Sequence, residues 1–348
     1  MKLSVIVPCY NVAPFLDRAM RCLTNQSLTD LEIICIDDKS TDNTVQELHR
    51  WARNDLRIRI IENKKNIGVG PTRNRGLDVA TGEYIGFMDP DDFIDTEFFE
   101  RLISFADSAN LECVCGQLCV VDIDGRKHYD PYRSATELRR THHNFKYHYT
   151  AIYRRDFLNA FQIRYPALSI NEDSVFETMV KCAISRPMGF VRGVYYYYCR
   201  RAESLNSDYW PEKKIRDSIN GIGMILDIYN MRPVSKRDYI CGAHGYFHYL
   251  YTVTMGKNTQ TKHLVATAAC ELFQKLQFRE KYAMDNLPLY LALMNNDPAG
   301  VIGVLKAQKW YVRTYSLFGR IKFLTISYNS VNRIVRLFGI KIYSIKLK

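Results

Sequence analysis

Short apolar segments alternate with longer amphipathic segments through the first hundred residues. The apolar segments predict strands, and the segments between them carry apolar positions at helical spacing. The expected strands are residues 3–9, 31–36, 58–61 and 84–88, and the expected helices are residues 14–25, 40–52 and 72–79. This alternation of strand and helix predicts an α/β fold with a mainly parallel sheet that helices flank.

The pattern changes after about residue 110. Residues 111–200 are mixed and richer in strands, with expected strands at 149–153 and 194–198 and an acidic helix start at Asn171-Glu172-Asp173. From about residue 212 the apolar positions recur at helical spacing. The domains expected from these changes are an α/β domain at 1–212, a helical region at 213–310 and a basic amphipathic segment at 311–348.

Positive charge is concentrated at the C-terminal end. The chain has 48 Lys or Arg and 37 Asp or Glu, a net charge of +11. Residues 298–348 contain ten Lys or Arg and no Asp or Glu, so the rest of the chain is nearly balanced. Basic residues mixed with apolar ones predict contact with an anionic membrane surface. A helical domain with a basic face, or a tail packed on another subunit, is the alternative. No nucleic-acid-binding motif accompanies the charge, so nucleic acid is not an expected partner.

The cysteines and the chain start bear on the compartment. The ten cysteines are scattered and match neither a zinc site nor a disulfide framework, which favours reduced thiols. The chain begins directly with an apolar strand, so no signal peptide is expected, and no uncharged apolar run is long enough to span a bilayer. We therefore expect a cytoplasmic protein, peripheral at the inner face of the cytoplasmic membrane.

Three carboxylates follow the strand at residues 84–88. Asp89, Asp91 and Asp92 surround Pro90, and carboxylates this close repel one another unless a cation holds them. Asp89 and Asp91 could face one Mg²⁺ or Mn²⁺ ion, which keeps open positions for water and phosphate oxygens. The alternative is an acidic turn that caps the next helix, and for Asp92 that alternative is as good as a functional role.

Several motifs in order carry a resemblance to a known family. They are Val7-Pro8-Cys9-Tyr10-Asn11, Ile36-Asp37-Asp38-Lys39-Ser40-Thr41-Asp42, Asn66-Ile67-Gly68 with Arg73-Asn74-Arg75-Gly76-Leu77, Asp89-Pro90-Asp91-Asp92, and Glu172-Asp173-Ser174-Val175-Phe176. Their order and spacing resemble the family 2 glycosyltransferases of bacterial surface-glycan type, which have the GT-A fold and use sugar nucleotides. The resemblance covers about residues 1–210, and motifs in register are more specific than any one of them.

The resemblance implies a nucleotide site. The second aspartate of the pair, Asp38, would recognise the nucleobase, and a carboxylate can accept the imide proton of uracil. A turn or a helix cap is the alternative for Asp37 and Asp38, and a serious one for Asp37 and Asp42. The nucleotide-binding residues that the resemblance implies are Pro8, Tyr10, Asn11, Asp38, Gly68, Arg73, Asp89 and Arg201.

The resemblance also implies the catalytic chemistry. Asp91 would ligate a divalent metal, Mn²⁺ or Mg²⁺, with Asp89 at the ribose or the metal shell. Asp173 would be the general base that deprotonates the acceptor hydroxyl, and Glu172 is the second catalytic candidate. A single displacement of this kind inverts the anomeric configuration. The alternative for Glu172 and Asp173 is that acidic residues favour a helix N-terminus.

Some positions depart from the family pattern or stay open. Lys39 replaces a common Gly, and Cys199 stands where a first basic residue is usual. Arg75 could be a solvated surface charge. Three histidines, His142, His143 and His148, precede the strand at 149–153. For them, solvated or hydrogen-bonded loop positions are favoured over a metal-binding trio.

The sequence therefore predicts an inverting, metal-assisted glycosyltransferase. It would move a sugar from a nucleotide sugar, with UDP-sugars favoured, to a hydroxyl of a glycan or lipid-linked glycan. The alternatives are a metal-dependent nucleotidyltransferase and a catalytically idle scaffold that binds nucleotide and membrane. An oligomer is left open.

Overall fold

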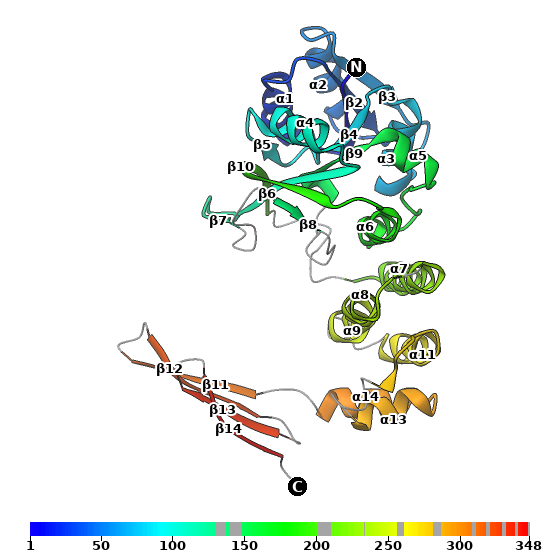
Figure 1. Ribbon diagram of the computed structural model, residues 1–348, viewed down its shortest axis with the longest axis vertical. Coiled ribbons are helices and arrows are strands. Elements are labelled where there is room, and N and C mark those ends of the chain that lie inside the picture. Colours follow the sequence, from blue (N-terminus) through cyan, green and yellow to red (C-terminus); the bar gives the residue numbers. More distant parts are fainter. Residues whose placement is uncertain are drawn as a thin grey trace. The chain divides into compact units, whose positions relative to one another are not determined.

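The computed structural model describes most of the chain (Figure 1). The described residues are 1–129, 137–139, 148–200, 210–232, 234–255, 261–280, 287–307, 311–317, 321–328, 332–337 and 340–346. The chain divides into two compact units, Met1–Tyr246 and Phe247–Lys348. The first unit contains all the described motif residues and positions the candidate site.

Four parallel strands form one side of the sheet, in the order β3-β2-β1-β4 with β3 at the edge. Their bounds are Leu3–Cys9 (β1), Leu31–Asp37 (β2), Ile58–Glu62 (β3) and Tyr84–Phe87 (β4). The four predicted strands are confirmed, with ends that differ by one residue at most. Because parallel strands point the same way, the loops after β1, β2 and β4 lie at one edge of the sheet.

Beyond β4 the sheet is mixed. Strand β9 runs antiparallel to both β4 and β6, β10 runs parallel to β6, and β5 closes the edge antiparallel to β10. Two short strands pair at the side, β7 with β6 and β8 with β10. The bounds are Phe93–Ile94 (β5), Cys113–Val121 (β6), Lys127–Tyr129 (β7), Glu137–Arg139 (β8), Ala151–Arg154 (β9) and Met188–Cys199 (β10). The predicted α/β sheet is confirmed, and the antiparallel pairs are additions to it.

Helices cover both faces, because the central strands bury side chains on both. Val5 of β1 lies in one core with Leu16 and Phe99 from helices α1 and α4, and the next residue, Ile6, lies in the other core with Leu77 of α3. Each such buried side chain contributes about 1.5–3 kcal/mol. The helices of this unit before residue 200 are Ala13–Thr24 (α1), Thr44–Ala52 (α2), Val69–Val79 (α3), Phe98–Ala109 (α4), the 3₁₀ helix His148–Thr150 (η1), Arg155–Ala160 (α5) and Glu172–Ala183 (α6).

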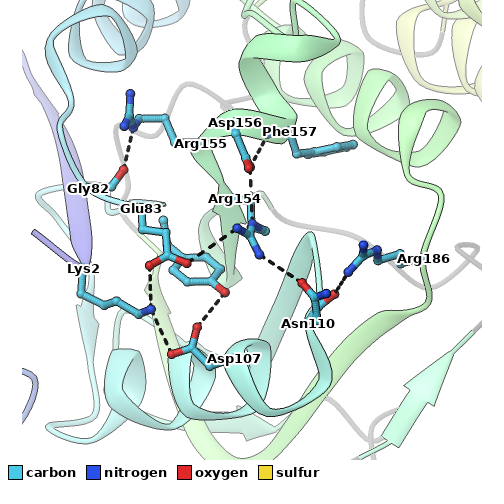
Figure 2. Close-up of polar contacts among 11 residues, drawn as sticks. Lys2, Gly82, Glu83, Asp107, Asn110, Arg154, Arg155, Asp156, Phe157 and Arg186 are labelled. Atoms are coloured by element: carbon cyan, nitrogen blue, oxygen red, sulfur yellow. Dashed lines mark hydrogen bonds and ion pairs between the residues drawn. The ribbon is translucent and has the colours of Figure 1, made fainter.

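A polar network ties the amino end of β4 to its neighbours (Figure 2). Lys2 Nζ lies 2.7 Å from a Glu83 oxygen and 3.0 Å from an Asp107 oxygen. Arg154 of β9 lies 3.8 Å from Glu83 and donates to Asn110 Oδ1 at 3.1 Å. These groups are partly exposed, so each ion pair contributes little, about 0–1 kcal/mol. The network joins β1, β4, β9 and α4 at the end of the sheet opposite the aspartates after β4.

The described residues between 212 and 307 are mainly helical, as the pattern predicts. Helix α7 packs against α6. The elements are Glu212–Met231 (α7), Lys236–Tyr239 (α8), Ile240–His244 (η2), Gly245–Tyr249 (α9), Leu250–Thr254 (η3), Lys262–Phe273 (α11), Leu287–Met294 (α13) and Pro298–Ala307 (α14). Among the described residues, no helix combines the length and the apolar character needed to cross a membrane. All ten cysteines are free.

The basic C-terminal segment is a four-stranded antiparallel sheet in the order β11-β12-β13-β14. The strands are Tyr311–Leu317 (β11), Ile321–Tyr328 (β12), Asn332–Leu337 (β13) and Ile340–Lys346 (β14). The alternative of a basic helical face is therefore wrong for these residues. Alternating apolar and polar residues, as in Ile340-Lys341-Ile342, favour a strand over a helix.

Candidate functional site

The turn after β4 contains one fully buried aspartate. The Asp92 carboxylate accepts hydrogen bonds from the Tyr196 hydroxyl at 2.8 Å and from the Cys199 backbone N–H at 2.7 Å. Burial, together with the negative charges of Asp91 and Asp89, raises the pKa of Asp92 well above its usual range. The next element is β5, and α4 begins only at Phe98. The helix-cap alternative for Asp92 is therefore wrong, because this side chain ties the turn to β10.

Asp89 and Asp91 have the chemistry of a site for a divalent metal. They lie on either side of Pro90, and Asp89 is 25% exposed. Within the described part of the chain, no three His, Cys, Asp or Glu side chains form a metal site. Mg²⁺ is commonly held by one or two carboxylates, with phosphate and water oxygens as the remaining ligands. Two carboxylates at the end of a buried strand fit that pattern.

Arg73 joins this turn to helix α6. It is only 4% exposed, and it pairs with Asp89 Oδ1 at 2.9 Å and with Glu172 Oε1 at 3.0 Å. Its guanidinium carbon lies 5.3 Å from the ring centroid of Tyr165. Although burial alone would lower the Arg73 pKa, the neighbouring Asp89 and Glu172 charges raise it above its usual value. Arg73 thus brings together carboxylates from two motifs that are far apart in the sequence.

Glu172 and Asp173 occupy the first turn of α6, as predicted. Glu172 is 12% exposed, and burial and the adjacent Asp173 charge raise its pKa to about 7, against the opposing effect of Arg73. Asp173 is half-buried, and its Oδ1 lies 2.7 Å from the backbone nitrogen of Ser174. The positive end of the helix dipole favours negative charge at both positions. Because its pKa is about 7, Glu172 can exchange a proton near neutral pH.

Asp38 organises the start of α3. It is 3% exposed, and its carboxylate accepts hydrogen bonds from Asn63 Nδ2 at 2.7 Å and from the backbone N–H groups of Ile67 and Gly68 at 2.9 and 2.8 Å. Gly68 has φ +87°, a value that favours glycine. A carboxylate offers about four acceptor positions, and three are used here. One position is left with which Asp38 could accept a hydrogen bond from a ligand.

The neighbouring carboxylates support the loop. Asp37 accepts from the Ser40 backbone N–H at 3.0 Å, and Asp42 accepts from those of Thr44 at 3.0 Å and Ala13 at 3.2 Å. These bonds match the turn alternative for Asp37 and Asp42. Lys39, which follows Asp38, has φ +65°. Glycine adopts this left-handed backbone conformation easily and would therefore suit position 39.

The loop after β1 is joined to the loop after β2. The Asn11 side chain accepts from the Thr41 backbone N–H at 2.8 Å, and the Asn11 N–H donates to Ser40 Oγ at 3.0 Å. Tyr10 is 48% exposed beside these bonds, whereas Pro8 is buried in β1 and pairs in register with Ile36. Tyr10, Asn11 and Asp38 thus belong to one connected pair of loops, and Pro8 lies in the strand that leads into it.

Asn74 is a site residue to which the sequence analysis assigned no role. Its side chain donates to the Tyr165 carbonyl at 2.8 Å and accepts from the Tyr165 N–H at 2.9 Å. The Tyr165 ring stacks on Phe176 of α6 at 4.2 Å. A Cβ atom on Gly70 would lie 2.4 Å from the Pro166 carbonyl oxygen, so α3 needs glycine there. These contacts hold α3 against α6. In the sequence, only the position of Asn74 next to Arg73 indicated that it belongs to the site.

The remaining predicted residues differ in outcome. Arg75 is exposed, but it contacts the Asn63 side chain. The prediction of a loop histidine is wrong for His148, which is 2% exposed and packs against the rings of Phe87 and Tyr165. Burial and the Arg73 charge lower the His148 pKa well below its usual value. Arg201, His142 and His143 lie outside the described residues.

Comparison with known proteins places this arrangement in a family. Residues 4–175 match the family described as glycosyl transferase family 2. EpsJ of Bacillus subtilis (strain 168), an uncharacterized glycosyltransferase, is 40% identical over 114 residues, which cover 32% of this chain and 33% of EpsJ. The crystal structure of S. aureus TarS 1–349 in complex with UDP-GlcNAc has a TM-score of 0.76 at 21% identity, covering 100% of this chain and 99% of that one. The mannosyltransferase PcManGT from Pyrobaculum calidifontis, in complex with GDP-Man and Mn²⁺, has a TM-score of 0.51 at 14% identity and covers 88% and 86%.

The likeness to TarS shows that the fold is of the GT-A type. The chain belongs to glycosyl transferase family 2, and residues 4–175 are its family domain. It spans about a third of the length of EpsJ.

Proposed function

We propose that the protein transfers a sugar from a nucleotide sugar, with a UDP-sugar as the favoured donor, to a hydroxyl group, with inversion at the anomeric carbon. The observation that carries this proposal is the Arg73 bridge, which connects Asp89 after β4 with Glu172 at the start of α6. Carboxylates suited to a metal–diphosphate therefore lie in one network with carboxylates suited to proton transfer. The UDP-GlcNAc bound by TarS supports a UDP-sugar donor.

In this proposal the donor binds along the loops after β1, β2 and β4. Asp38 uses its remaining acceptor position for the nucleobase, and the exposed Tyr10 borders the same loops. Asp91 and Asp89 would hold Mn²⁺ or Mg²⁺, and the Mn²⁺ bound by PcManGT supports a divalent ion. The ion would supply positive charge that stabilises the departing nucleoside diphosphate.

Asp173 accepts the proton of the acceptor hydroxyl, and Glu172 acts mainly through Arg73. Asp173 is half-buried, whereas the Glu172 carboxylate is paired with Arg73 at 3.0 Å. A carboxylate within hydrogen-bonding reach of the hydroxyl provides the general base that a single displacement needs.

A donor panel tests the function. We expect the protein to release nucleoside diphosphate from a UDP-sugar in the presence of Mn²⁺ and a glycan acceptor, and to lose the activity when the metal is removed with EDTA. Asp91→Asn should raise the Mn²⁺ concentration for half-maximal activity at least tenfold, because one ligand carboxylate loses its charge. Asp124→Asn, an exposed aspartate between β6 and β7, is the control. UDP binding without consumption of any donor would favour an idle scaffold.

The acceptor is proposed to be a glycan or a lipid-linked glycan, reached at the inner face of the cytoplasmic membrane. The support is the charge of residues 298–348, with ten Lys or Arg and no Asp or Glu. An anionic bilayer attracts such a segment by about 1 kcal/mol per basic residue near the surface.

Vesicle co-sedimentation measures this attraction. The full chain should bind vesicles with about 30% phosphatidylglycerol at least tenfold better than pure phosphatidylcholine vesicles. Salt at about 0.5 M should remove the difference, because it shortens the Debye length to roughly 4 Å and screens the surface charge. Replacing Lys322 and Arg336 by Glu should weaken binding. Equal binding to both vesicle types would instead favour a contact with another subunit.

A further inference from the structure

Arg18 of α1 reaches across to the turn that contains Asp91. One guanidinium nitrogen donates to the Asp91 carbonyl, and the guanidinium carbon lies 5.2 Å from the ring centroid of Phe93. The same guanidinium lies beside the Cys199 thiol. Burial raises the Cys199 pKa to about 11, and the charge and hydrogen bond of Arg18 act in the opposite direction. One exposed side chain therefore contacts the turn on both sides of Asp92 and also the end of β10.

Position 199 borders the same turn from the other side. The Cys199 N–H donates to Asp92 Oδ1 at 2.7 Å, so the last residue of β10 is fixed against the turn. Cys199 itself carries no positive charge. The Arg18 guanidinium brings a positive charge to this place from α1.

We propose that Arg18 is a positioning residue. It holds the Asp91 turn in the orientation that binds the metal–diphosphate, and it supplies the cation that position 199 lacks. This inference rests on the proposed function.

Two contacts of Arg18 give it this effect. A carbonyl held by a charged donor fixes the peptide plane of Asp91 and so limits where the adjacent carboxylate can point. On the other side of Arg18, the Phe93 ring stacks on Tyr197 at 4.4 Å with an interplanar angle of 7°, which fixes the ring that Arg18 covers. Because Arg18 is exposed, its loss should change the turn more than the stability of the whole fold.

Arg18→Met and Arg21→Met form a matched pair. Both residues are exposed arginines on α1, but Arg21 pairs with Asp17 at 2.7 Å and does not reach the turn. We expect Arg18→Met to speed hydrogen exchange at the Asp92 amide at least tenfold, since this amide closes the turn by donating to the Asp89 carbonyl. It should also weaken binding of UDP with Mn²⁺, measured by calorimetry without turnover, about tenfold. Arg21→Met should change neither, and both variants should melt within a few degrees of the wild type.

A second substitution tests whether a positive charge at position 199 can take the place of Arg18. Cys199→Arg in the Arg18→Met background should recover most of the lost affinity and slow the exchange again. Unchanged Asp92 exchange in Arg18→Met would overturn the inference, as would an equal effect of Arg21→Met or a double variant no better than Arg18→Met. If the wild type binds no UDP with Mn²⁺, the proposed function fails, and the exchange rates still decide whether Arg18 holds the turn.

Discussion

Asp173→Asn is expected to lower the rate of sugar transfer about 10³-fold while leaving donor binding unchanged, because a positioned general base contributes about 10²–10⁴-fold. The amide keeps the size and the helix position of the side chain but cannot take the acceptor proton. Acceptor-dependent release of nucleoside diphosphate measures the rate, and calorimetry with the unreacted donor measures binding.

Glu172→Gln is the matched control, since it changes the adjacent residue of the same helix turn in the same way. It should reduce transfer far less, because Gln still accepts a hydrogen bond from Arg73. A loss of 10³-fold in Glu172→Gln together with near-normal activity in Asp173→Asn would reverse the two roles.

The pH profile separates the two carboxylates further. The Glu172 pKa is raised to about 7, so below that pH Glu172 becomes protonated and its pairing with Arg73 weakens. Wild-type transfer should therefore fall modestly as the pH drops through 7, to about the level of Glu172→Gln, which should lack this limb. In the folded state Glu172 binds its proton more tightly than in the unfolded chain, so its contribution to stability decreases as the pH rises from about 4.5 to about 7.

Arg73→Met is expected to lower the free energy of unfolding by about 3–5 kcal/mol, because removing one partner of a buried ion pair leaves uncompensated charge. Here two carboxylates, Asp89 and Glu172, would lose their cation. Urea denaturation at pH 8 measures the loss. The loss should be smaller at pH 5, where Glu172 is protonated and carries no charge.

Two further variants serve as controls for Arg73→Met. Arg75→Met removes an exposed arginine from the same helix and should cost no more than about 0.5 kcal/mol. Arg73→Lys keeps the charge but not the two-sided geometry, so it should fall between Arg73→Met and the wild type. Equal stabilities of Arg73→Met and Arg75→Met would show that the bridge does not support the fold.

Much of the site was predictable, because its carboxylates follow apolar strands or open a helix. Asp38 and Asp89 come at the ends of buried strands, and such ends gather at one edge of a parallel sheet. Local patterns did not reveal what each carboxylate contacts. Asp92 could equally have capped a helix, and only its bonds to Tyr196 and Cys199, more than one hundred residues away, exclude that role.

The sequence by itself determined the alternation of strands and helices, the order of the motifs and the uneven charge, since all three depend on the spacing of residue types along the chain. Only the tertiary structure decided that β9 runs antiparallel, that Arg73 joins Asp89 to Glu172, and that Arg18 reaches the Asp91 turn. The physical reason is the same in each case. Strand direction, ion pairing and burial depend on neighbours that are distant in sequence, and no periodicity in the chain records which neighbours meet.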